Sequence, residues 1–111
     1  MTGKEKALKW IAEQSAAICN HPDVFSCTWI AKDIGEPVRK VRQYMKELEA
    51  EGYVKKAHEG GWDDWNARIY CIHGYALTKK GAETEYYKAK YKADADWWNE
   101  SLKRGASEDE Y

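Results

Sequence analysis

The stretch Thr28–Lys56, TWIAKDIGEPVRKVRQYMKELEAEGYVKK, decides the fold of this chain. It predicts two short helices joined by a tight turn and followed by a strand. Thr28 is a suitable N-cap for the first helix, and Gly35 suits its end because glycine adopts the left-handed conformation without steric cost. Pro37 fits the first turn of the second helix, and Gly52 ends that helix. Apolar residues recur every three or four positions and predict a core-facing side: Ile30, Ala31, Ile34, Val38, Val41, Met45 and Leu48.

The opposite side of the second helix is basic, and no acidic residue lies between Pro37 and Lys46. Its polar residues are Arg39, Lys40, Arg42, Gln43 and Lys46. This pattern fits a helix that recognises DNA, because cations contact phosphates while guanidinium and amide groups bond to base edges. We expect Arg39, Lys40 and Gln43 to face the major groove. Arg42 and Lys46 then face phosphates, and Thr28 joins them at the start of the preceding helix. The alternative is a solvated helix face, since charged side chains are usually exposed.

The sequence resembles a known family at these positions. The run IAKDIGEPVRKVRQYMKELEAEGYV is similar to the helix-turn-helix of bacterial winged-helix regulators, and YALTKKGAE, Tyr75–Glu83, resembles the end of the wing in MarR-like and PadR-like regulators. The resemblance covers roughly Lys4–Glu83 and implies a small bacterial, plasmid or phage transcriptional regulator that binds DNA. The residues that produce it are Ile30, Ala31, Ile34, Gly35, Val38, Val41, Leu48, Glu49, Gly52 and Val54.

The whole chain predicts an α+β fold: a winged helix-turn-helix with a three-helix core, a two-stranded wing and a long C-terminal helix. We expect the winged domain to span residues 1–78, the last helix 79–104 and a disordered acidic tail 105–111. Within the winged domain the expected segments are a helix over Lys4–Cys19, a turn over Asn20–Asp23, an extended piece over Val24–Cys27, and strands over Tyr53–His58 and Ala67–Tyr75. Thr78 is expected to cap the last helix.

The expected wing tip, Glu59–Asn66, departs from the pattern of DNA-contacting wings. Gly60 and Gly61 permit a sharp turn there. The tip presents acids that repel phosphates, and Trp62 and Trp65 are more typical of a protein-binding anchor. The alternative is that one tryptophan packs on the sheet. Arg68, just inside the returning strand, remains a candidate contact to the DNA backbone.

The last helix has an aromatic stripe that includes Tyr87, Tyr91, Trp98 and Leu102. At about 1.5 Å per residue this helix is too long for so small a domain to cover. An apolar stripe that projects beyond the domain favours a partner. We expect a homodimer through this helix, and the alternative is that the helix folds back on the first helix of the same chain.

Composition narrows the function. The chain has 111 residues, which is the length of one domain, and a net charge of −1, whereas nucleic-acid-binding domains are more often basic. It has no apolar run of membrane-spanning length and no signal peptide, so we expect a cytoplasmic protein. We find no phosphate-binding loop or nucleophile motif and expect neither an enzyme nor a cofactor.

Cysteine and histidine lie two residues apart at Cys19 and His21 and again at Cys71 and His73. Four such ligands suit zinc, but the C-x-x-C spacing of zinc ribbons is absent, and an odd number of cysteines favours free thiols. We therefore expect no metal. Two functions remain: sequence-specific binding of double-stranded DNA as a transcriptional regulator, and a winged-helix module that binds another protein through its wing and last helix.

Overall fold

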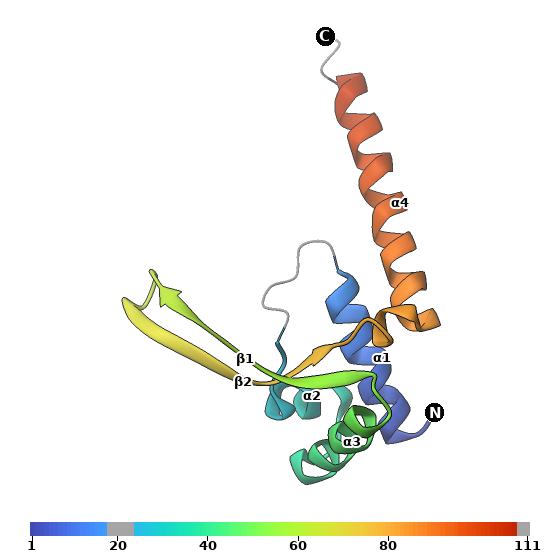
Figure 1. Ribbon diagram of the computed structural model, residues 1–111. Coiled ribbons are helices and arrows are strands. Elements are labelled where there is room, and N and C mark those ends of the chain that lie inside the picture. The colour runs from blue at the N-terminus through green and yellow to red at the C-terminus, as the bar shows by residue number, and fades with distance from the viewer. Residues whose placement is uncertain (18–23, 109–111) are drawn as a thin grey trace.

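The computed structural model describes residues 1–17 and 24–108 (Figure 1). Within these residues, three helices precede a two-stranded antiparallel sheet and a long helix follows it, so the predicted α+β architecture is confirmed. The elements are α1 Gly3–Ala16, α2 Cys27–Ile34, α3 Val38–Ala50, β1 Val54–Asp63, β2 Arg68–Leu77, the 3-10 helix η1 Gly81–Glu83 and α4 Glu85–Glu108. The expected turn at 20–23 lies outside the described residues. In the part of the chain that the structure describes, no helix is long and apolar enough to cross a bilayer.

The caps of α2 and α3 differ from the sequence prediction. Ser26, not Thr28, caps α2, since its Oγ accepts a hydrogen bond from the N–H of Trp29 at 3.2 Å. Gly35 ends α2 with φ of 73°, as predicted, and its N–H bonds to the Ala31 carbonyl. Pro37 is the residue before α3 rather than part of its first turn. Both Ser26 and Thr28 are good capping types, so local sequence alone did not separate them.

The core lies between the three helices and the base of the sheet. The predicted apolar side is correct, because Ile30, Val41, Met45 and Leu48 are fully or almost fully buried. Each such side chain stabilises the fold by about 1.5–3 kcal/mol. Phe25, which the sequence did not indicate as a core residue, is also fully buried. The Trp10 and Trp29 rings pack against it, with ring centroids 5.2 and 5.3 Å from that of Phe25.

The sheet is a long ribbon that projects from the helices (Figure 1). Backbone hydrogen bonds from Phe25 hold its base. Its strands pair from Val54 with Leu77 to Asp63 with Arg68. Phe25 adds a short third partner, because its N–H bonds to the Tyr75 carbonyl at 2.9 Å and its carbonyl accepts from the Tyr75 N–H at 3.0 Å.

The wing turns later than predicted. Gly60 and Gly61 lie inside β1, where the Tyr70 side chain approaches Gly61 from the opposite strand. The turn forms at residues 64–67 because Asp63 Oδ1 accepts hydrogen bonds from the N–H groups of Trp65 and Asn66, at 3.0 and 3.2 Å. A side chain that bonds to the backbone in this way stabilises a turn without glycine.

The entry to the last helix also differs. Thr78 Oγ1 accepts a hydrogen bond from the Gly81 N–H at 3.2 Å, at the start of η1, whereas Thr84 Oγ1 accepts from the Tyr87 N–H and caps α4. α4 begins beside α1 and then projects away from the domain (Figure 1). The alternative that the last helix folds back on the first helix therefore holds only for the beginning of α4. The helix runs to Glu108 and includes residues 105–108 of the segment expected to be disordered.

We expect Gly74→Ala to destabilise the protein strongly. A methyl group there would collide with the backbone of Phe25 and would lie 2.9 Å from Cα of Ser26. Backbone cannot rotate away, so the change should cost about 3 kcal/mol of unfolding free energy, at the upper end of overpacking costs. Gly60→Ala is the control, since its methyl would meet only the Tyr70 carbonyl at 3.3 Å. Urea unfolding curves measure both, and equal losses would contradict the importance of this contact.

Candidate nucleic-acid interface

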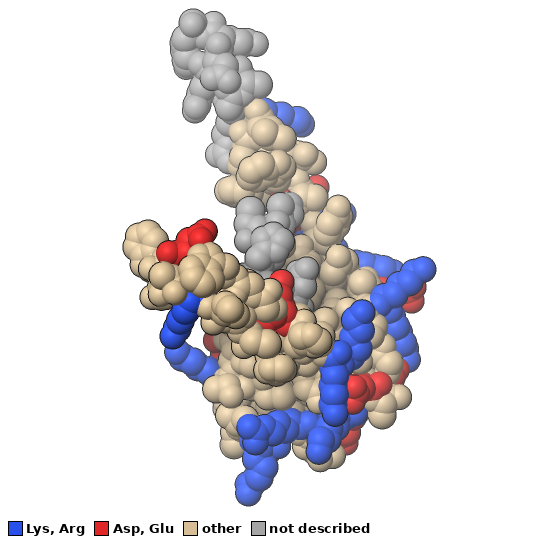
Figure 2. All heavy atoms as spheres, turned by 60° about the vertical axis from the view of Figure 1, so that its left-hand side comes forward, with Lys and Arg blue, Asp and Glu red and all other residues tan. Residues whose placement is uncertain are grey.

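The exposed side of α3 is densely cationic. Val41 and Met45 face the core, so the other side of this helix is left in solvent. All of the predicted residues on that side are exposed: Arg39, Lys40, Arg42, Gln43 and Lys46. Figure 2 shows Lys and Arg gathered around the lower end of the molecule, the end where α3 lies in Figure 1. The helix periodicity thus placed these side chains correctly on one exposed surface.

These cations have no acidic partners in the part of the chain that the structure describes. The ion pairs there join Lys4 to Glu51, Lys9 to Glu13 and Lys90 to Asp94, and none involves an Arg or Lys of α3. An unpaired guanidinium or ammonium group attracts an external anion more strongly than one whose charge is already compensated. The α3 surface is therefore suited to a polyanion.

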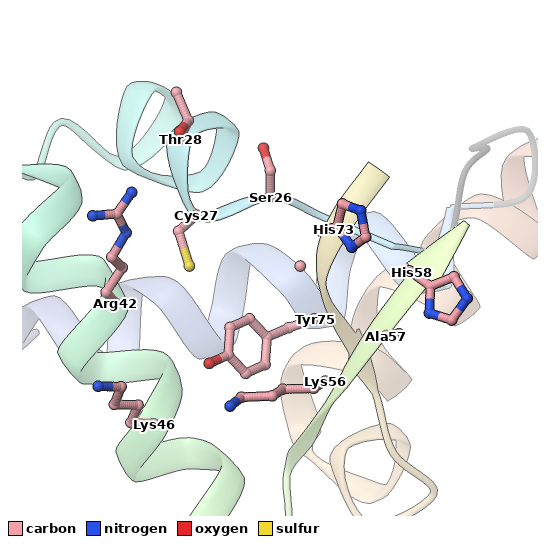
Figure 3. A pocket seen from close by; sticks show the side chains of 11 residues that line it. Ser26, Cys27, Thr28, Arg42, Lys46, Lys56, Ala57, His58, His73 and Tyr75 are labelled. Carbon is pink, nitrogen blue, oxygen red and sulfur yellow. The ribbon is translucent and has the colours of Figure 1, made fainter. Parts of the chain in front are cut away.

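A groove of about 530 Å³ extends this surface toward the wing (Figure 3). In Figure 3, Lys56 extends from β1 toward α3, across the groove from Arg42 and Lys46. The groove connects three elements, α2, α3 and the base of the sheet. Its lining side chains are Ser26, Cys27, Thr28, Arg42, Lys46, Lys56, Ala57, His58, His73 and Tyr75.

The start of α2 forms one wall of this groove. The groove is lined there by Ser26, Cys27 and Thr28. Ser26 Oγ accepts a hydrogen bond from the Trp29 N–H. The first N–H groups of a helix lack partners within the helix, and the positive end of its dipole favours anions. A phosphate in the groove would meet this helix end together with the cations of α3 and β1. Thr28 is exposed and lines this groove, and its predicted role as a cap is wrong because Ser26 caps α2.

The thiol of Cys27 and the hydroxyl of Tyr75 are the groove groups that could become anions, and burial keeps both neutral. It raises the pKa of the Cys27 thiol, although the charge of Arg42 acts in the opposite direction. Burial also raises the pKa of the Tyr75 hydroxyl, with smaller contributions from Cys27 and Glu49. Neither group becomes an anion at neutral pH, so neither offsets the positive charge of Arg42, Lys46 and Lys56.

Arg68 does not join the other predicted residues. It pairs with Asp63 at the far end of the ribbon, seven positions along β2 from Tyr75. The nearest groove residue on β2 is His73, five positions from Arg68, so at about 3.4 Å per residue Arg68 lies roughly 17 Å from the groove. The sequence also missed the contribution of Lys56, which alternation along a strand places on the same side as His58.

The acidic tip of the wing is too far away to neutralise the groove. Glu59 lies on the opposite side of the ribbon from His58, and Asp63 is seven residues along β1 from Lys56. The resulting distance of roughly 23 Å exceeds two Debye lengths at physiological ionic strength. The basic groove and the acidic tip therefore act as separate surfaces.

Large apolar side chains are exposed at the tip of the wing and along α4. At the tip, Trp65 is 94% exposed and Ile69 is 80% exposed, and Trp62 is exposed beside them. The sequence left open that one tryptophan packs on the sheet, but both Trp62 and Trp65 are mostly exposed. On α4, Tyr87 and Tyr91 stack with ring centroids 6.3 Å apart. Trp98 and Leu102, farther along, are 45% and 57% exposed.

The four-ligand zinc set considered from the sequence is only partly described. Cys19 and His21 lie outside the described residues, whereas Cys71 Sγ and His73 Nε2 lie 3.3 Å apart on β2. Among the described side chains, no group of three or more His, Cys, Asp or Glu residues is placed so that it could hold a metal ion.

Three solved structures of MepR from Staphylococcus aureus are similar to this chain. Ethidium-bound MepR superposes with a TM-score of 0.52 and 15% identity, over 97% of this chain and 75% of that chain. The fold is a winged helix. MepR described as a transcription regulator of the multidrug efflux pump MepA gives 0.49 and 14% identity, and a MepR mutant gives 0.47 and 18%.

The last two superpositions include 94% and 97% of this chain, but only 65% and 66% of the respective MepR chains. No family model matches the sequence, and no curated protein matches it. The comparison therefore establishes the fold, and the function has to be argued from the surfaces described above.

We expect alkylating reagents to modify Cys71 before Cys27. The thiolate is the reactive form, and burial raises the pKa of Cys27 and limits access to it, whereas Cys71 is exposed. Iodoacetamide labelling followed by peptide mass spectrometry, at mildly alkaline pH, should show slower modification of Cys27. The difference should disappear in denaturant. Equal rates in the folded protein would contradict the half-buried position of Cys27.

Proposed function

We propose that this protein is a cytoplasmic transcriptional regulator that binds double-stranded DNA in a sequence-specific manner. The observation that supports this most directly is the exposed face of α3, whose cations lack acidic partners within the described residues. That face continues into a groove with further cationic and helix-terminal groups. A helix with this surface, in a winged-helix fold, suits the major groove of DNA.

The side chains divide into two roles. Arg39, Lys40 and Gln43 lie on the outward face of α3, where they can reach base edges. Arg bonds in a bidentate manner to guanine and Gln to adenine, so these residues supply sequence discrimination. Phosphates contact the cations that line the groove, together with the start of α2, and these contacts fix the position of the helix. The residues in this second role are Thr28, Arg42, Lys46 and Lys56.

The solved structures support the same function at the level of fold. MepR is described as a transcription regulator. The ethidium-bound form shares the fold of this chain at 15% identity. Since one fold serves many functions, this similarity adds to the argument from the α3 surface and does not replace it.

We further propose a homodimer in which α4 packs against α4 of a second copy. Beyond its contact with α1, this helix projects into solvent with Tyr91, Trp98 and Leu102 exposed. Burying apolar surface of this kind contributes about 25 cal/mol per Å². A two-fold dimer would present two α3 helices about 34 Å apart, on successive major grooves of a palindromic site.

A second candidate function is binding of another protein. The exposure of Trp62, Trp65 and Ile69 at the wing tip favours it, since exposed apolar clusters mark interaction sites. The two functions use different surfaces, so substitutions in α3 distinguish them. A protein-binding module would be unaffected by the removal of single cations from α3.

We expect Arg39→Ala to weaken specific DNA binding by about 1–3 kcal/mol and to relax preference at one base pair, because one bidentate contact is lost. Lys46→Ala should instead weaken binding to all sequences and lower the salt-dependence slope by about 1. Selection from a random DNA library, followed by fluorescence anisotropy at several salt concentrations, measures both effects.

Lys79→Ala is the control, because Lys79 is an exposed lysine that does not line the groove. It should leave affinity and specificity unchanged. Equal and small effects of all three substitutions would show that the α3 face is only solvated. If the unmodified chain selected no sequence from the library, the conclusion would be the same: the α3 face does not read DNA sequence.

We expect the 111-residue chain to be a dimer with twice the 12.9 kDa chain mass. Replacing both Trp98 and Leu102 by Glu should give monomers and a large loss of DNA affinity, since the second half-site is then bound independently. Light scattering and anisotropy measure the two effects. Replacing the exposed Ala89 and Ala93 by Glu adds the same charge on the opposite side of α4 and should preserve the dimer. A monomeric unmodified chain at micromolar concentration would exclude this assembly.

A further inference from the structure

Two histidines from the two strands of the wing lie together at one end of the groove. His58 in β1 is directly opposite His73 in β2, and their ring centroids are 6.0 Å apart. Both side chains are exposed, and both line the groove that also contains Arg42, Lys46 and Lys56. Figure 3 shows the two rings at the end of the groove farther from α3. They are far apart in the sequence, so only the register of the strands brings them together.

The side of the ribbon that carries these histidines has no acidic residue from either strand. Side chains alternate along a strand, and directly paired residues point to the same side. Glu59 and Asp63 therefore point to the opposite side from His58, and Asp64 belongs to the turn. A phosphate backbone that leaves the groove along the histidine side meets no carboxylate of β1 or β2. The neighbours of the pair on this side are Lys56, Gly60, Cys71 and Tyr75.

The two rings have nitrogen atoms available for an external acceptor. His73 Nε2 contacts Cys71 Sγ at 3.3 Å. Among the described residues, no other hydrogen bond or ion pair involves a ring nitrogen of His58 or His73. Both nitrogens of a protonated imidazole donate hydrogen bonds, whereas a neutral imidazole donates from only one. A protonated pair can therefore give at least two charge-assisted hydrogen bonds to one phosphate.

The charges around the pair couple its protonation to the binding of an anion. The permanent charges among the groove residues are the cations Arg42, Lys46 and Lys56. Two imidazolium ions 6.0 Å apart repel each other and these cations, and a bound phosphate offsets that repulsion. The complex therefore holds more protons than the free protein, and by linkage the affinity increases as pH falls. The other titratable side chains that line the groove or contact the pair, among the described residues, are Cys27, Cys71 and Tyr75.

We propose that His58 and His73 bind a DNA phosphate as a protonated pair and so make the affinity for DNA depend on pH. This inference rests on the proposed function, and it extends the phosphate contacts from α2 and α3 along the wing. Histidine changes its charge between pH 5 and 8, whereas lysine and arginine stay charged there. The contribution of the pair is therefore present at mildly acidic pH and is lost as pH rises through neutrality. Up to two protons are taken up from solvent when one chain binds.

The test is fluorescence anisotropy at pH 7.5 and pH 6.0, with the reduced 111-residue chain and the duplex selected from the random library. Each proton taken up raises affinity by as much as about tenfold per pH unit, and we expect a rise of at least about fivefold over this range. The slope of log affinity against log salt concentration should also steepen by about 1 at pH 6.0, because one more phosphate is neutralised.

Substitution of both histidines separates their contribution from other effects of pH. His58→Gln combined with His73→Gln keeps polar side chains that cannot gain a proton, so affinity should change by less than about twofold between the two pH values. His58→Lys combined with His73→Lys fixes the charge and should bind at pH 7.5 about as tightly as the unmodified chain at pH 6.0. Cys71→Ser is the matched control, because it changes the neighbour of His73 but leaves both rings, and it should keep the pH response. Circular dichroism at both pH values checks the folding of each variant.

The outcomes separate this inference from the proposed function. Only this inference fails if the unmodified chain binds the selected duplex equally at both pH values, or if the double glutamine variant keeps the pH response. Loss of the response in Cys71→Ser would assign it to the thiol and would also overturn the inference. If no duplex is bound at either pH, the proposed function fails and this inference fails with it.

Discussion

The paired hydrogen bonds between Phe25 and Tyr75 attach the wing to the helices and set the position of every surface described above. Phe25 is fully buried among aromatic rings, and its backbone holds Tyr75 at the base of β2. Ser26 follows at once and starts α2. One short segment thus orients the sheet, begins a helix and closes the core. The absence of a side chain at Gly74 allows this close approach of two backbones.

Charge is separated along the molecule rather than balanced within each surface. Cations gather around α3 and the base of the wing, and the acids of the wing lie toward its tip, where Arg68 is opposite Asp63. The net charge of −1 therefore hides a strongly basic groove. At physiological salt, a distance of more than two Debye lengths makes the two regions electrostatically independent. A phosphate in the groove responds to nearby charges, so the overall composition is a poor guide to what this surface binds.

The aromatic residues serve two different purposes. Trp10 packs edge to face against both Phe25 and Trp29 and stabilises the small core, where such contacts add to apolar burial. Those of the wing tip and α4 remain in solvent. A winged domain of this size has no further layer to cover them. Their exposure is the physical basis of the proposed dimer and of the alternative proposal that the chain binds another protein.

Sequence periodicity by itself determined the order of the helices, the buried side of α3 and its exposed cations, because these depend on local spacing and burial. It misplaced the features that depend on contacts between distant residues. Thr28 and Ser26 are equivalent caps locally, and only the pairing of Phe25 with Tyr75 decides between them. Gly60 and Gly61 suggested a turn, but strand register and the Asp63 side chain moved it to residues 64–67. Tertiary structure alone brought Lys56 to the groove and His58 opposite His73, since register is a relation between two strands that no local pattern contains.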